Sequence, residues 1–251
     1  EAWIYAGYPS VEIAEVEDYT KDFEYDMSKY KLWGTNWKLK MPDQFPIKTY
    51  IDYGLDKDPK EEFKIDPFVS VLEYLGYLRK GEQCWIQILF RQHRKETLID
   101  GRLFPSTDWR DTIDAEIEKI RKDATPDYGG QFRGFPNPTP VQKDVMEALA
   151  RSREKLAFDV MIRGLYIAKA ENFNITSVTG LVGAWRQFSS MSLNRFGITN
   201  WTDFDYSWLV DPWRVRRTAR EYKFIDAFKQ RSFFQYPYKF WLAEPYILTS
   251  E

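Results

Sequence analysis

The sequence predicts an α+β protein, because stretches with the two-residue period of strands and stretches with the 3.6-residue period of helices both occur. Apolar residues make up 43% of the chain and aromatic residues 18%, which is enough to form a core. The 251 residues exceed the usual size of one domain, about 100 to 200 residues, and residues 125–140 are rich in glycine and proline. We therefore expect two lobes, 1–124 and 141–251, joined by a linker at 125–140.

The first half has the pattern of a ferredoxin-like lobe whose opening strand lies upstream of residue 1. The first residues read as the end of a helix that Gly7 stops. Asp66-Pro67 predicts a second helix, with the aspartate as N-cap and the proline at the first helical position. Alternating apolar residues predict strands, namely 11–18, 36–40, 46–53 and 84–91. Helix, strand, strand, helix, strand is the ferredoxin-like order without its first strand.

The second half is expected to form a lobe of similar architecture. An amphipathic helix at 107–123 precedes the linker, and Thr139-Pro140-Val141-Gln142 is a capping-box start for the next helix. Further elements are predicted from periodicity, namely a strand at 156–170, helices at 176–196 and from Asp211-Pro212 onward, and a strand at 246–248. Strand followed by helix repeats the order of the first lobe.

One helix carries a local concentration of positive charge. The net charge of the chain is -2, so no global field attracts nucleic acid or an anionic membrane. After Asp211, the basic side chains form one predicted face and the apolar side chains form the other: Arg216, Arg217, Arg220 and Lys223 opposite Val215, Ala219, Tyr222 and Ile225. This basic face predicts contact with an anionic partner, and a merely solvated helix surface is the alternative.

Residues for catalysis, metals or cofactors do not assemble into a recognisable motif. No glycine-rich loop continues into Gly-Lys-Ser or Gly-Lys-Thr, which a phosphate-binding loop requires. His93 and Cys84 are the only histidine and cysteine, too few for structural zinc or Cys-His chemistry. We therefore expect no catalytic residue, cofactor or metal, and no enzyme. Cys84 is expected to be buried and unpaired, as in a reducing compartment.

Several segments resemble a family of bacterial membrane-associated proteins of unassigned function, linked to type IV secretion and to conjugation-type ATPases of the HerA/FtsK class. They include Glu1-Ala-Trp-Ile-Tyr-Ala-Gly-Tyr-Pro, Ile65-Asp-Pro-Phe, Gly81-Glu-Gln-Cys-Trp-Ile-Gln, Phe135-Pro-Asn-Pro-Thr-Pro and Ala157-Phe-Asp-Val-Met-Ile-Arg. The resemblance implies a membrane-proximal part, a ferredoxin-like region and an ATPase that is fused or separate. It carries no catalytic residues over to this chain.

The function expected from this resemblance is a non-enzymatic assembly or adaptor region of a secretion or DNA-transfer apparatus. Its place would be the cytoplasmic side of the membrane, with any anchor outside this segment. The implied partners are protein subunits, including a HerA/FtsK-class ATPase, an anionic membrane or DNA, and further copies of the chain. A phage or cell-surface structural component and a carbohydrate-active enzyme remain as alternatives. An enclosed polar pocket with perturbed carboxylates would favour the enzyme.

Overall fold

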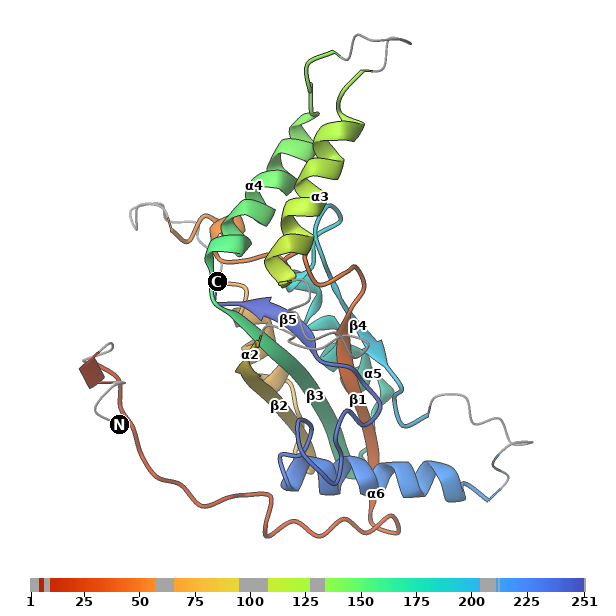
Figure 1. Cartoon of the computed structure of the whole chain (residues 1–251). Coiled ribbons are helices and arrows are strands. Elements are labelled where there is room, and N and C mark those ends of the chain that lie inside the picture. The colour runs from red at the N-terminus through yellow and green to blue at the C-terminus, as the bar shows by residue number, and fades with distance from the viewer. Residues whose placement is uncertain are drawn as a thin grey trace.

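The computed structural model describes residues 5–6, 10–56, 66–94, 108–126, 134–203, 211 and 213–250. Within them the strands form one antiparallel sheet in the order β2-β3-β1-β4, with β5 beside the start of β3 (Figure 1). The strands are β1 (Tyr30–Leu39), β2 (Glu82–Gln92), β3 (Ala157–Lys169), β4 (Phe196–Thr199) and β5 (Tyr246–Thr249). This sheet and the helices around it confirm the α+β class.

Helices cover both faces of the sheet. Alternate side chains of a strand point to opposite faces, so Tyr166 of β3 packs with α2 (Val69–Gly76) and α5 (Ile175–Gly183). Its neighbour Leu165 packs on the other face against α6 (Val215–Lys229). β3 is the central strand, and its residues from Val160 to Ala168 are all buried. Figure 1 shows α6 crossing one face while α2 and α5 lie behind the sheet.

The two lobes expected from the sequence do not have separate sheets. β3, from the second half, lies between β1 and β2, from the first half, and pairs with both along their length. The order β1, α2, β2, β3, α5, β4 has the split βαβ element order of ferredoxin-like proteins, with two helices inserted between β2 and β3. The opening strand of this pattern is β1, whereas we expected it before residue 1. The difference arises because residues 11–18, which were counted as a strand of the expected pattern, form no strand in the structure.

The inserted helices, α3 (Trp109–Asp123) and α4 (Pro140–Glu154), form a hairpin that projects from one end of the sheet (Figure 1). Each begins with a capping box, from Asp108 and Asp111 in α3 and from Thr139 and Gln142 in α4. Their apolar faces make a separate cluster at this end: Trp109, Ile113, Val145, Ala148 and Leu149, together with Leu193. α3 was predicted from its periodicity, and α4 was predicted from its capping box.

Three predicted elements are wrong. Residues 11–18 form no strand; Val16 is exposed, so the alternating pattern there faces no core. Residues 46–53 contain only the 3-10 helix Ile51–Tyr53, which Gly54 ends in the left-handed conformation. The helix expected at 176–196 ends at Gly183 and is followed by the 3-10 helix Arg186–Phe188. The strand β4, which has only four residues, was not predicted. None of the helices in the described residues is long and apolar enough to cross a membrane.

Candidate functional site

The predicted basic face of α6 does not point outward as a unit. The helix buries Phe224, Ile225 and Phe228 against the sheet, and of these three Ile225 was predicted to face the core. In the first half, Val215, Ala219 and Tyr222 are exposed, although they were expected to face the core. The buried residue there is Glu221, so a polar network takes the place of apolar packing. This rotation brings two of the four predicted basic residues inward.

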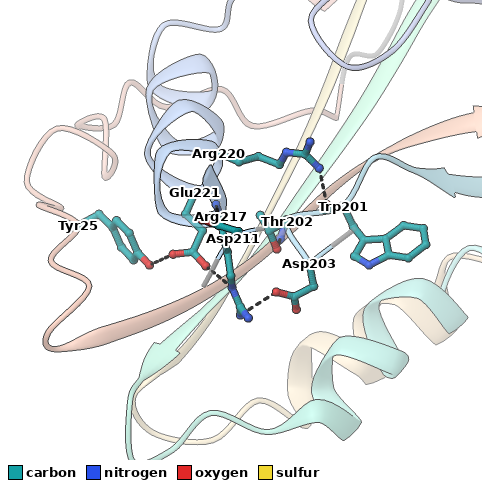
Figure 2. A network of polar contacts seen from close by, with 9 residues as sticks. Tyr25, Trp201, Thr202, Asp203, Asp211, Arg217, Arg220 and Glu221 are labelled. Carbon is teal, nitrogen blue, oxygen red and sulfur yellow. Dashed lines mark hydrogen bonds and ion pairs between the residues drawn. The ribbon is translucent and has the colours of Figure 1, made fainter. Parts of the chain in front are cut away.

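Arg217 lies at the centre of this network (Figure 2). Its Nη2 atom lies 2.7 Å from Oδ1 of Asp203, and its Nε atom donates to Oε1 of Glu221 at 3.1 Å. The hydroxyl of Tyr25 donates to the other oxygen of Glu221 at 2.8 Å. Burial raises the pKa of Glu221, whereas hydrogen bonds from Tyr25 and Arg217 act in the opposite direction. These contacts join α6 to the segment before β1 and to the segment after β4.

The start of α6 is held by two further contacts. The backbone N-H of Arg217 donates to Oδ2 of Asp211 at 2.9 Å. Burial raises the pKa of Asp211, but the N-H groups of residues 215–217 outweigh it and hold that pKa below its ordinary value. Arg220 donates from Nη1 to the carbonyl oxygen of Trp201 at 3.1 Å. Arg217 and Arg220 are therefore engaged within the chain, while Arg216 and Lys223 are exposed on one side of the helix.

A cavity of about 540 Å³ opens beside β1, β4 and the segment before β5. Its polar lining residues include Lys38, Asp43 and Glu244. Burial raises the pKa of Asp43, which also accepts a hydrogen bond from the backbone N-H of Ile247 at 3.2 Å. The described part of the chain gathers no group of three metal-ligating side chains, here or elsewhere.

A second cavity, of about 280 Å³, lies where β2 ends and α3 begins. Nδ1 of His93 lies 2.6 Å from Oδ1 of Asp159, and Arg91 donates from Nε to the other oxygen at 2.8 Å. A carboxylate and the histidine that it orients are two of the three members of a catalytic triad. The described residues that line this cavity include no serine, threonine or cysteine nucleophile. The pairing of His93 with Asp159 could not be predicted from the sequence.

Arg163 is a fully buried charge on the central strand. It donates to Oδ1 of Asn36 at 3.3 Å, to Oε1 of Gln87 at 3.4 Å and to the carbonyl oxygen of Ser232 at 3.3 Å. Burial lowers its pKa to about 10, so the side chain is still protonated at neutral pH. It joins β3 to both neighbouring strands and to the segment after α6.

Exposed apolar side chains occur on two neighbouring elements at the β2 edge of the sheet, α2 and β2. β2 is the end strand, and among the described residues β3 is its one hydrogen-bonded neighbour. Several large apolar side chains of α2 and β2 remain exposed: Phe68 53%, Leu72 54%, Leu75 36%, Ile88 52% and Phe90 67%. We call these five residues and the outer side of β2 the edge surface. An unpaired edge strand with apolar side chains is a template for another chain.

The orientation of α2 places its exposed residues over this edge. Tyr74 of α2 packs against Gly180 of α5, where an added Cβ would lie 2.8 Å from the tyrosine ring. Residues in a helix are about 100° apart, so Leu72 lies on the side of Val71 opposite Tyr74, as do Phe68 and Leu75. α5 lies towards β1, because Leu181 approaches Gly164 beside the ring of Trp37. The exposed side of α2 therefore faces away from α5, towards the β2 edge (Figure 1).

Cys84 lies under α2 and is free, as predicted. It is half-buried, less than expected, beside Tyr74 in the core on that face. Burial raises the pKa of its thiol to about 12, and a hydrogen bond with Tyr74 opposes the shift. The sequence identified Cys84, but the helix predicted from Asp66-Pro67 did not indicate that Phe68, Leu72 and Leu75 would be exposed.

The chain was compared with known proteins and protein families. No curated protein and no solved structure matches it. A family model described as a domain of unknown function, DUF8128, matches residues 5–242, which include the whole sheet apart from β5. Since this match covers most of the chain, the protein belongs to the DUF8128 family of unknown function.

Proposed function

We propose that this chain is a non-enzymatic assembly module that joins protein subunits through the edge surface. The observation that carries the proposal is the position of Leu72 and Phe90, exposed apolar residues from different elements beside one unpaired strand. Exposed apolar residues that occur singly are common, whereas a contiguous group indicates an interaction site. Strand addition at such an edge supplies affinity through backbone hydrogen bonds, and the side chains supply specificity.

The second part of the proposal concerns the apparatus to which this module belongs. The resemblance of the sequence to proteins linked with type IV secretion supports a secretion or DNA-transfer apparatus on the cytoplasmic side of a membrane. It also supports a HerA/FtsK-class ATPase as one of the protein partners. The fold is consistent with an adaptor, because the edge surface lies on the opposite side of the sheet from β4 and leaves the α3-α4 hairpin free for other contacts.

Contact with an anionic membrane or DNA remains a proposal, but with fewer basic residues than the sequence predicted. Of the four basic residues expected to make this contact, Arg217 and Arg220 bind acceptors within the chain, so Arg216 and Lys223 would carry it. The double variant Arg216→Glu/Lys223→Glu should then weaken binding to vesicles that contain anionic lipid, and to DNA, at low salt. Equal binding by the wild type and this variant would leave α6 as a solvated surface.

The test of the main proposal is binding of the chain to a purified HerA/FtsK-class ATPase from the same organism. Leu72→Glu and Phe90→Glu place charges in the edge surface and should each weaken the complex at least tenfold. Met191→Glu is the matched control, since Met191 is 90% exposed and lies outside this surface. Binding that is equally strong in all four proteins would contradict an assembly role for the edge surface in that complex.

A further inference from the structure

We infer that the edge surface binds a second copy of this chain, with the two β2 strands antiparallel across a twofold axis at Gln87. This inference rests on the proposed assembly function and names the partner. Two copies related by such an axis join their sheets into one, as isologous interfaces do. Three features support this pairing: the sequence of β2, the position of α2 over β2 and the charges at the strand ends.

The sequence of β2 is self-complementary about Gln87. With Gln87 opposite itself, Ile86 of one copy faces Ile88 of the other, and Trp85 faces Leu89. Cys84 then faces Phe90, and Gln83 faces Arg91, so apolar residues meet apolar residues and polar residues meet polar ones. Directly opposed residues in an antiparallel pair share a face and contact each other. Moving the axis by one residue to Ile86 would set Glu82 opposite Phe90 and Gln83 opposite Leu89.

The position of α2 over β2 also fits this register. Within one copy, α2 lies over the first half of β2, where Cys84 and Ile86 are partly buried in the core. Ile88 and Phe90 continue the same face of the strand but are more than half exposed. The twofold axis brings the first half of one β2 beside the second half of the other. The exposed side of α2 from each copy would therefore lie over Ile88 and Phe90 of its partner.

The charges are compatible with this arrangement. The β2 residues that would meet at the centre, from Cys84 to Phe90, carry no formal charge. In this register Glu82 faces Gln92 of the other copy, and Arg91 faces Gln83. Like charges therefore do not oppose each other across the axis, whereas a parallel pair in register would align Glu82 with Glu82 and Arg91 with Arg91.

The first test is the mass of the chain in solution as a function of concentration, by analytical ultracentrifugation. The wild type should show a monomer-dimer equilibrium. Leu72→Glu and Phe90→Glu should each raise the dissociation constant at least tenfold, and Met191→Glu should leave it unchanged. Circular dichroism and thermal unfolding establish that each variant is folded, which is expected because the substituted side chains are exposed.

The second test fixes the register. In a Cys84→Ser background, Gln87→Cys should form a disulfide-linked dimer on mild oxidation, because opposed residues have Cα atoms about 4.5 to 5.5 Å apart. Ile88→Cys in the same background should not form it, since its two copies would be offset by two residues along the strands. If Gln87→Cys does not fold, the double variant Ile86→Cys/Ile88→Cys provides the same test. The cysteine at position 86 of one copy would then face the cysteine at position 88 of the other.

The outcomes distinguish pairing with a second copy from the proposed assembly function. A wild type that is still monomeric at about 100 μM would overturn pairing with a second copy. If the edge variants still weaken ATPase binding in that case, the proposed assembly function stands with a different partner. A dimer that survives both glutamate variants, or that cross-links through Ile88→Cys alone, would overturn this interface. Failure of the edge variants in both assays would contradict both proposals.

Discussion

The ring of Tyr74 in α2 packs against Gly180 in α5, where there is no room for a Cβ atom. This contact sets the rotation of α2 about its axis and thereby turns Leu72 towards the outer edge of β2. The exposed apolar residues of α2 are thus a consequence of how its buried face packs. A helix pattern in the sequence shows that such residues exist but not which of two apolar sides meets the core.

Gly180→Ala should destabilise the fold although alanine is the better helix former. The added methyl group would lie 2.8 Å from Cδ2 of Tyr74, and overpacking of this kind costs about 1–3 kcal/mol. Gly183→Ala is the matched control, because an added Cβ there meets no atom within 4 Å. It should raise the free energy of unfolding by up to about 1 kcal/mol. Urea unfolding measures both, and equal effects of the two substitutions would contradict the packing described for Tyr74.

Arg217→Glu should destabilise the chain far more than Arg216→Glu, although the two arginines are neighbours. The first substitution places three carboxylates together, those of residues 203, 217 and 221, and removes two ion pairs. These groups are partly exposed, so we expect a loss of about 1–3 kcal/mol, below that of a fully buried pair. Arg216→Glu should change the free energy of unfolding by less than about 0.5 kcal/mol. Similar losses in the two variants would show that Arg217 is not engaged as described.

The carboxylate of Asp211 should stabilise the start of α6 in a pH-dependent manner. Its pKa in the folded protein is lower than in the unfolded chain, so the folded state binds fewer protons between the two values. The stabilisation is therefore present above the unfolded pKa and is lost as the pH falls through the folded one. Asp211→Asn keeps an acceptor but loses the charge. Its melting temperature should lie below that of the wild type at pH 6, and the difference should shrink as the pH falls below about 4. A difference that does not depend on pH would rule out a role for the charge.

Cys84 should react slowly with thiol reagents in the folded protein. Burial raises its pKa to about 12, so the reactive thiolate is scarce at pH 8. Labelling with a chromogenic disulfide should be about 100-fold slower in buffer than in urea, where the thiol has its ordinary pKa. Comparable rates in the two solutions would mean that α2 does not cover this part of β2.

The elements that could be predicted from the sequence are those with local signals. The capping box at Thr139 and the amphipathic pattern of 107–123 mark two helices correctly, and the apolar run of β3 marks a buried strand. The pairing of β3 with β1 and β2 depends on contacts between distant parts of the chain, which periodicity does not contain. A boundary at 125–140 therefore suggested two lobes, although strands on both sides of it share one sheet.

The candidate sites were harder to predict for a related reason. Arg217 looked like a surface residue because its acceptors, Asp203 and Glu221, are recognisable only once α6 is placed on the sheet. Conversely, Leu72 looked like a core residue because it is apolar and lies in an amphipathic helix, yet it is exposed. In both cases the residue type was informative about chemistry, and tertiary packing decided which surface the side chain faced.

Hydrogen-deuterium exchange of the β2 amides tests the central claim most directly. It should be followed in the wild-type chain at increasing concentration, and again with the ATPase added. If the edge surface is the assembly site, amides of residues 82–92 that do not bond to β3 should gain protection as the complex forms. Phe90→Glu should show no such gain at the same concentrations. Exchange in β2 that stays unchanged while ultracentrifugation shows the chain to be assembled would contradict the claim.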